Sequence, residues 1–144
     1  MIEDSRLQIS AIETTLGRIL IHLNRVDAAL PYLESAFAYR AKVLPESQWE
    51  RFKTASILGH AYVRVGRFVR AEELLLDAFE RIQLDRGPEH YRTTQALFRI
   101  LDLYTRWEKK EAWQRYRGRL TESALAHPII KANRKLWEEV IAED

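Results

Sequence analysis

Apolar residues recur three and four positions apart along almost the whole chain, and no stretch alternates apolar and polar residues as a β-strand does. Short turns interrupt this periodicity, and prolines mark longer breaks because proline cannot continue a helix. The pattern predicts seven helices, at residues 4–23, 26–43, 47–65, 68–85, 89–107, 109–126 and 129–142. Pro31 lies inside the second of them, where it either kinks the helix or moves its start to a later residue. The chain is therefore predicted to be all-α, with three helical hairpins and a final single helix.

Eight positions recur at a shift of 42 residues, and seven of the eight pairs are identical. The first set is Leu16, Gly17, Leu20, Arg25, Ala29, Leu33, Ala36 and Phe37, and the second is Leu58, Gly59, Tyr62, Arg67, Ala71, Leu75, Ala78 and Phe79. A fixed period of this length predicts an α-solenoid, in which each hairpin buries its apolar face on the next. Gly59 and Ala71 are small where two helices are expected to cross closely, so leucine at either position should cost roughly 1 to 3 kcal/mol.

The third hairpin follows the same plan less closely. Leu101 stands where Gly59 does, and Ala112 is expected to replace Ala71 after a one-residue shortening of the turn at 107–110. The last helix has one mainly apolar stripe, as in a helix that caps the open end of a solenoid. This stripe consists of Ile129, Ile130, Asn133, Leu136, Trp137 and Val140. The predicted units are residues 4–45, 46–88 and 89–126, followed by a cap helix at 128–142, in a single domain, 1–144.

The segments Leu16-Gly17 and Leu58 to Tyr62, together with Ala71 and Ala78, resemble the tetratricopeptide repeat, whose hairpins carry small residues at these crossings. The longer period, closed by Pro45 and Pro88, resembles the 42-residue variant typified by kinesin light chains and found in bacterial arrays. The resemblance covers about residues 12–120. It implies a right-handed superhelix whose concave groove is lined by the first helix of each hairpin, and a non-catalytic module that binds a peptide or partner segment there.

The resemblance implies which positions of each first helix face the groove. At these positions the chain has nine residues that we predict to form a peptide-binding groove. They are Arg18, His22, Lys53, His60, Arg64, Phe98, Arg99, Asp102 and Arg106, with Thr14, Ser56 and Gln95 also on these faces. Five of the nine are Lys or Arg and one is acidic, so the groove should favour an acidic or carboxylate-bearing peptide. Phe98 is expected to serve there as an exposed aromatic anchor. The alternative interpretation is that these arginines are simply solvated on exposed helix faces.

Chaperone-tail binders among tetratricopeptide proteins use a clamp of Lys, Asn, Asn, Lys and Arg for two carboxylates. The matching positions here are Thr14, Arg18, Ile57, Gln95 and Arg99. Because only the last position agrees, the sequence predicts that chaperone C-terminal tails are not the ligand.

Composition excludes several other classes of function. The 144 residues include 23 Lys and Arg against 21 Asp and Glu, and a net charge of +2 does not call for a nucleic-acid ligand. Zero cysteines exclude disulfides and thiolate zinc sites, and no apolar run is long enough for a membrane span, so a cytoplasmic protein is expected. The four tryptophans are expected in the core or between repeats.

No catalytic, metal or cofactor site can be recognised. The four histidines include no pair at i and i+4, and His90 is expected to start a helix rather than bind a ligand. The carboxylate pairs at 72–73 and 138–139 point in different directions on their helices, and there is no glycine-rich phosphate loop or nucleophile elbow. The sequence therefore predicts no enzyme and no cofactor.

Two further classes of function stay open. The first is a structural, regulatory or self-associating segment of a larger protein, for example the repeat tail of a protein kinase. An unusually apolar first helix supports this class and makes a homodimer an alternative. Its apolar residues are Ile9, Ile12, Leu16, Ile19, Leu20 and Leu23. The second is nucleic-acid binding through the basic groove, which predicts a steep loss of affinity with salt.

Overall fold

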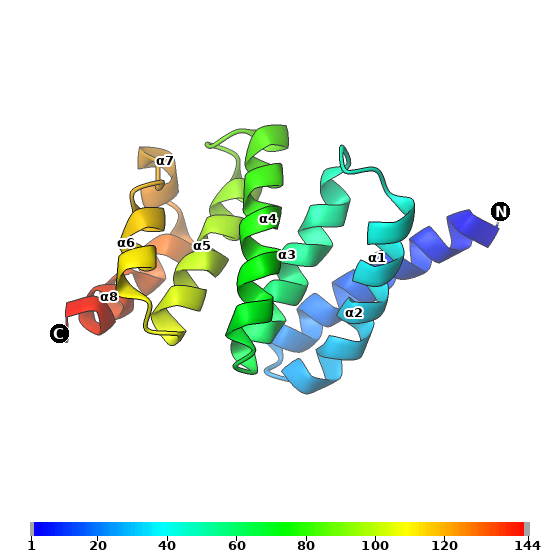
Figure 1. Cartoon of the computed structure of the whole chain (residues 1–144), viewed down its shortest axis with the longest axis horizontal. Helices are drawn as coiled ribbons and strands as arrows, with labels where there is room; N and C mark the ends of the chain where they lie inside the picture. Colours follow the sequence, from blue (N-terminus) through cyan, green and yellow to red (C-terminus); the bar gives the residue numbers. More distant parts are fainter. Residues whose placement is uncertain (1, 143–144) are drawn as a thin grey trace.

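The computed structural model of the protein describes residues 2–142. In this part of the chain all regular structure is helical, and it forms an all-α helical repeat solenoid (Figure 1). The helices are α1 (Ile2–His22), α2 (Val26–Val43), α3 (Trp49–Arg64), α4 (Phe68–Arg86), α5 (Tyr91–Arg106), α6 (Lys110–Arg117), α7 (Glu122–Leu125) and α8 (Pro128–Ala142). None of these helices is long and apolar enough to span a bilayer.

Helices α1 to α6 each pack against the next along the chain, and α8 packs against α5 and α7, so the array runs from α1 at one end to α8 at the other (Figure 1). The helices α1, α3 and α5 also contact one another in sequence. They form one layer of the solenoid, and α2, α4 and α6 form a second layer over it (Figure 1). This arrangement places the first helix of each hairpin along a common face.

The 42-residue period is repeated in the geometry of the hairpin turns. Asn24, Gly66 and Glu108 occupy the same turn position, and all three have left-handed backbones, with φ of 59°, 81° and 59°. In each turn the next amide donates to the carbonyl five residues earlier, at 2.8, 2.9 and 2.9 Å, which is the hydrogen bond that ends a helix on a left-handed residue. The expected shortening of the third turn is therefore wrong. Because Glu108 adopts the conformation that Gly66 has, the turn keeps its length, and Trp113 rather than Ala112 takes the place of Ala71.

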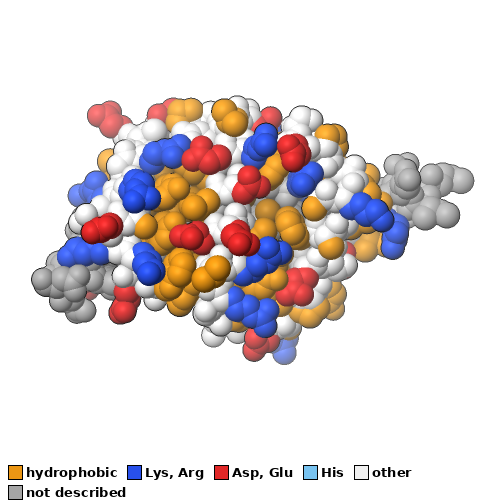
Figure 2. Space-filling view, viewed as in Figure 1, with side chains coloured by type: hydrophobic (Ala, Val, Ile, Leu, Met, Phe, Trp, Pro, Cys, Tyr) orange, Lys and Arg blue, Asp and Glu red, His pale blue; other side chains and the backbone are white. Residues whose placement is uncertain are grey.

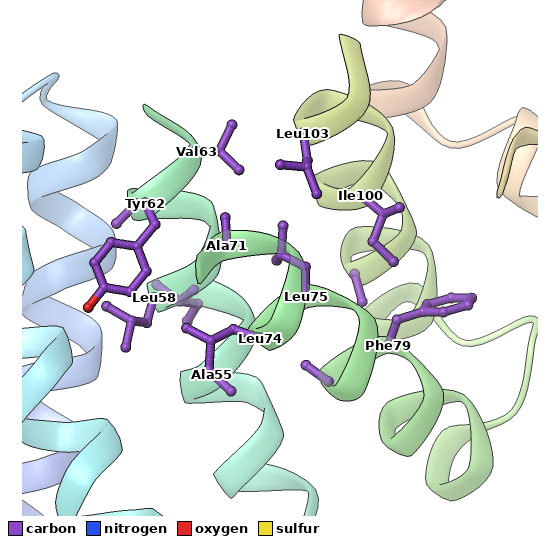
Figure 3. Packing of buried hydrophobic residues seen from close by; sticks show 14 of the residues in the cluster. Ala55, Leu58, Tyr62, Val63, Ala71, Leu74, Leu75, Phe79, Ile100 and Leu103 are labelled. Carbon is purple, nitrogen blue, oxygen red and sulfur yellow. The ribbon is translucent and has the colours of Figure 1, made fainter. Parts of the chain in front are cut away.

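The small residues lie where two helices of one hairpin cross, as expected. A Cβ atom added to Gly59 would lie only 2.8 Å from Cγ and Cδ2 of Leu75, so the Leu75 side chain fills the space that the glycine leaves. Gly17 faces Leu33 in the same way in the first hairpin. Figure 3 shows Leu75 among the buried side chains that fill the space between α3, α4 and α5. Fully burying such a leucine stabilises the fold by about 1.5 to 3 kcal/mol.

Two predictions about helix boundaries need correction. The expected helix at 109–126 is broken between Arg117 and Glu122 into α6 and α7. Gly118 is a poor helix former, and the Thr121 hydroxyl accepts a hydrogen bond from the Ala124 amide at 3.0 Å, which starts a new helix. By contrast, Pro31 does not delay the start of α2, which is continuous from Val26. Pro31 is the sixth residue of α2, so its ring removes the amide that would donate to the Asp27 carbonyl, and the helix continues past this missing hydrogen bond.

Helix α8 covers the C-terminal end of the array. It begins with Pro128, which has no amide hydrogen to leave unpaired in a first turn. Ile130 and Trp137 of its predicted stripe are buried, and the Trp137 ring lies 6.2 Å from that of Trp113, edge to face. The side chains of Leu136 and Val140, also predicted for this stripe, lie outside the described residues. The expectation that tryptophans pack in the core is confirmed for Trp113 and Trp137.

Candidate functional site

The first helices of the three hairpins enclose a cavity of about 650 Å³, here called the central cavity. Helix α8 closes part of its wall through Ile129 and Asn133. The remaining lining residues are Arg18, Ile19, Ile21 and His22 of α1, Ile57, His60 and Arg64 of α3, and Arg92, Gln95, Phe98, Arg99, Asp102 and Arg106 of α5. The central cavity is therefore lined mainly by arginine, histidine and isoleucine.

Two positions of the 42-residue repeat supply six of these side chains. One position provides Arg18, His60 and Asp102, and the other, four residues later, provides His22, Arg64 and Arg106. Residues four apart lie on the same face of a helix. Because α1, α3 and α5 lie in one layer, equivalent positions from all three helices meet around the same cavity.

The structure brings together eight of the nine residues predicted for the groove, and Lys53 is the exception. The Lys53 ammonium lies over the ring of Trp49 instead, 5.7 Å from its centroid. Of the additional residues, Gln95 lines the cavity, whereas Thr14 and Ser56 are buried. Sequence reasoning missed Arg92, which also lines it. The seven-residue spacing of Arg92, Arg99 and Arg106 would have revealed it, since residues seven apart share a helix face.

The Arg99 side chain in the lining of the central cavity is held in place by a hydrogen bond. Its Nη1 donates to the hydroxyl of Ser56 at 2.8 Å, across the contact between α5 and α3. Burial, together with the positive charges of Arg92 and Arg18, lowers the pKa of Arg99 to about 10. The guanidinium still carries its charge at neutral pH, and a neutral hydroxyl does not cancel that charge.

Asp102 is the acidic residue of the lining, and it is already paired. Arg106 Nε donates to its two carboxylate oxygens at 3.2 and 3.1 Å. Burial raises the pKa of the Asp102 carboxyl, while Arg106 and Arg64 oppose that shift. The charges of Asp102 and Arg106 neutralise each other. The other four arginines of the lining have no carboxylate partner among the described residues: Arg18, Arg64, Arg92 and Arg99.

The other arginines have neutral partners or none. Arg64 Nη2 donates to the side-chain oxygen of Asn24 at 2.7 Å, and Arg92 Nη1 donates to that of Gln95 at 3.3 Å. Arg18 makes no hydrogen bond or ion pair with any residue of the described part of the chain. Four guanidinium groups therefore repel one another across the cavity, and an anion placed there would relieve this repulsion.

A family comparison can now be set beside this geometry. Residues 14–49 match the family model of the tetratricopeptide repeat. The matched segment runs from the middle of α1 through α2 to the first residue of α3, so it comprises most of the first hairpin. The match supports a tetratricopeptide repeat in this segment, and such repeats generally mediate protein–protein interaction without catalysis. No curated protein matches the chain. The kinesin-light-chain-like variant stays a prediction.

Phe98 lines the cavity, but it is not free to act as an exposed anchor. Its ring is half-buried and lies 5.5 Å from the ring of Trp137, tilted by 38°. The expectation failed because the last helix folds back across α5, a contact between residues 39 positions apart that the repeat pattern does not encode. Phe98 thus joins α8 to the cavity wall.

His60 is a neutral side chain among these cations. Burial lowers its pKa to about 3, and the charges of Arg99, Arg64 and Arg106 add to the effect. Its Nδ1 atom is buried and has no hydrogen-bond partner among the described residues. This buried polar atom without a partner is a cost of placing the imidazole in the cavity wall. Groups of three His, Asp or Glu placed to hold a metal ion do not occur within residues 2–142.

His90, in contrast, has the structural role that was expected of it. It is the residue before α5, and its Nδ1 accepts a hydrogen bond from the Arg92 amide at 3.1 Å. This cap satisfies one of the free amides of the first turn. The prediction that His90 starts a helix is confirmed.

Proposed function

We propose that the protein is a non-catalytic interaction module whose central cavity binds an acidic peptide segment of a partner protein. The observation that carries this proposal is the charge of the lining: five arginines converge on one cavity, and its one acid, Asp102, is already neutralised by Arg106. Arginine forks bind carboxylates through two parallel hydrogen bonds, and a concave wall of low dielectric strengthens the attraction.

The opposite layer of the molecule supports this assignment by contrast. In Figure 2 acidic and basic side chains alternate over the face formed by α2, α4 and α6. Several of them pair there, as Arg70 does with Glu73 at 3.3 Å and Arg119 with Glu80 at 3.0 Å. Because the whole chain carries a net charge of only +2, the unpaired cations of the central cavity are a local concentration of charge rather than a property of the composition.

A peptide suits the site better than a nucleic acid does. The cavity is bounded on one side by α8, and isoleucines from α1, α3 and α8 stand among the arginines. Such a mixed wall can take up the apolar side chains of a peptide beside its carboxylates. A nucleic acid would need a continuous basic surface that tracks a phosphate backbone. The proposal includes the expected cytoplasmic location.

The test measures binding of a fluorescein-labelled decapeptide of Asp and Glu, separated by glycine and leucine, against the same peptide with Asn and Gln. The variants are Arg18→Gln and Arg64→Gln, because neither side chain is fully buried and neither has an acidic partner. Each loses a charged hydrogen bond to the ligand, so affinity should fall about tenfold. Arg99 is not substituted, because its hydrogen bond to the buried Ser56 ties it to the packing of α5 on α3 and its replacement would change stability as well as binding.

The matched control is Arg70→Gln, which removes an exposed arginine from α4 on the opposite layer and should leave affinity unchanged. Equal binding of the acidic and amide peptides, or unchanged affinity in both cavity variants, would contradict the proposal. A single-stranded oligonucleotide that binds more tightly than the acidic peptide, with a steep salt dependence, would favour the nucleic-acid alternative.

A further inference from the structure

The outer face of α1 carries an uninterrupted aliphatic seam. Its residues are Ile9, Ile12, Leu16, Ile19 and Leu23, spaced three, four, three and four positions apart, as at the interface of a coiled coil. Four of them are strongly exposed: Ile9 by 53%, Ile12 by 65%, Ile19 by 47% and Leu23 by 62%. Single exposed aliphatic residues are ordinary, but a contiguous row of this length marks an interaction surface.

The repeat itself shows that this face is normally covered. The residues of α3 that lie 42 positions after Ile12, Leu16 and Ile19 are Thr54, Leu58 and Ala61, and all three are buried. The corresponding residues of α5 are Ala96, Ile100 and Leu103, and they are buried as well. There the second helix of the preceding hairpin covers them, whereas α1 is the first helix at its end of the array (Figure 1).

The chemistry of the α1 face differs from that of the two covered faces. Tyr62 donates its hydroxyl to Glu34 of α2 at 3.1 Å, and Tyr104 donates to Glu72 of α4 at 2.8 Å. The equivalent residue of α1 is Leu20, which has no hydroxyl. A covering helix of the α2 or α4 type would find no hydroxyl at Leu20 for its glutamate and would lose this hydrogen bond. The α1 face therefore selects a partner with an aliphatic stripe.

We propose that this partner is a second copy of the chain, with the seam of one α1 packed against the seam of the other about a two-fold axis. The seam is self-complementary because it contains aliphatic residues and no charge to repel its own copy. It is also shaped for interlocking: Ala11 and Thr15 leave an open hollow of about 430 Å³ between larger side chains, which a side chain of the partner can fill.

The size of the seam sets the strength of the dimer. Each copy contributes about 400 Å² of exposed aliphatic surface, so a symmetric pair buries roughly 800 to 1,200 Å² with its flanking residues, the lower limit of specific interfaces. No folding cost opposes association, because α1 is already held as a helix by α2 and α3. We therefore expect a monomer and dimer in equilibrium, with a dissociation constant in the micromolar range.

The first test follows molar mass by light scattering and sedimentation velocity from about 5 to 500 μM. The mass should rise from 17.0 kDa toward twice that value. Ile12→Asp should weaken the dimer about 100-fold, since a carboxylate would be buried without a partner. Leu84→Asp is the matched control: Leu84 is 79% exposed on α4, outside the seam, and this variant should dimerise like the unchanged protein.

The second test locates the contact. The chain has no cysteine, so a single Leu16→Cys substitution at the centre of the seam should form a disulfide-linked dimer under mild oxidation, whereas Leu84→Cys should not. A constant mass of one chain at every concentration would overturn the proposal. Open-ended growth beyond the dimer, equal loss of dimer in Leu84→Asp, or equal cross-linking of both cysteine variants would overturn it too.

Discussion

The crossing of α3 and α4 gives the sharpest test of the packing argument, through the substitution Gly59→Ala. It adds one methyl group to a helix interior, with no change of charge or polarity. That methyl carbon would lie 2.8 Å from Cγ and Cδ2 of Leu75 and 3.4 Å from the carbonyl oxygen of Ala71. Carbon atoms in good contact lie about 3.5 to 4.0 Å apart, so something must move by several tenths of an ångström.

Two opposing effects determine the magnitude. Alanine favours a helix over glycine by about 1 kcal/mol, which would stabilise the variant. Overpacking of a well-filled core costs about 1 to 3 kcal/mol, and Leu75 has little freedom to yield because it is 1% exposed. The Cγ atom is moreover close to the backbone, so rotating the end of the side chain does not remove the clash. We expect a net loss of about 1 kcal/mol in the free energy of unfolding.

The assay is urea unfolding followed by helical circular dichroism, with the midpoint compared at unchanged slope. Gly118→Ala is the control, since that glycine is exposed and its added methyl would meet no side chain within 4 Å, so stability should stay equal or rise slightly. Leu75→Ala alone should cost about 2 to 5 kcal/mol. In the double variant the new methyl fills part of that cavity, so the combined loss should be at least about 1 kcal/mol smaller than the sum. Additive losses, or a Gly59→Ala variant as stable as the unchanged protein, would refute the reasoning.

Two further predictions concern titration and turn geometry. The pKa of His60 is lowered to about 3 in the fold, below its ordinary value of 6.5, so the unfolded chain binds the extra proton and stability falls as pH drops below about 6.5. Up to about 2 kcal/mol of unfolding free energy should be lost between pH 7 and 5, and His60→Gln should abolish this loss. Urea unfolding of both proteins at the two pH values measures it. An equal loss in the variant would contradict the prediction. Glu108→Gly should raise the free energy of unfolding by about 0.5 to 1 kcal/mol, and Gly66→Ala should lower it by about 1 kcal/mol, because both positions have positive φ. Thermal unfolding checks both variants, and shifts of the opposite sign would contradict the turn assignment.

The parts of the fold that could be predicted from sequence are those that local chemistry determines. The hairpins of the first two units follow from apolar periodicity, and the crossings follow from Gly17 and Gly59, because close helix approach requires a small residue. The third unit was predicted less well. Glu108 gives no sign in its chemistry that it adopts a left-handed backbone, and the break after Arg117 depends on a local competition between a poor helix former and a capping threonine.

The candidate site was predictable to the extent that it follows the repeat. Residues at equivalent positions of three stacked helices must share a face, so four of the five arginines of the cavity could be placed from the sequence, and Arg92 was missed. Lys53 and Phe98 were misjudged because their side chains have alternatives that periodicity does not describe: an aromatic ring one turn away in the first case, and a returning helix in the second. Such contacts depend on tertiary packing across long sequence separations.

The repeat also separates the residues that build the scaffold from those that give it specificity. At the crossings the chain uses the same residues twice, as in the pairs of Gly17 with Leu33 and Gly59 with Leu75. At the position that faces the cavity it uses three different ones, Arg18, His60 and Asp102. Stacking requires identical spacing between helices, which constrains the crossings, but it places no such demand on side chains that point into a cavity. A symmetric scaffold thus presents an asymmetric wall, in which Asp102 and Arg106 of α5 form a neutralised pair while Arg18 of α1, Arg64 of α3, and Arg92 and Arg99 of α5 have no carboxylate partner among the described residues. A bound acidic segment is therefore expected to place its carboxylates at these four arginines and away from Asp102.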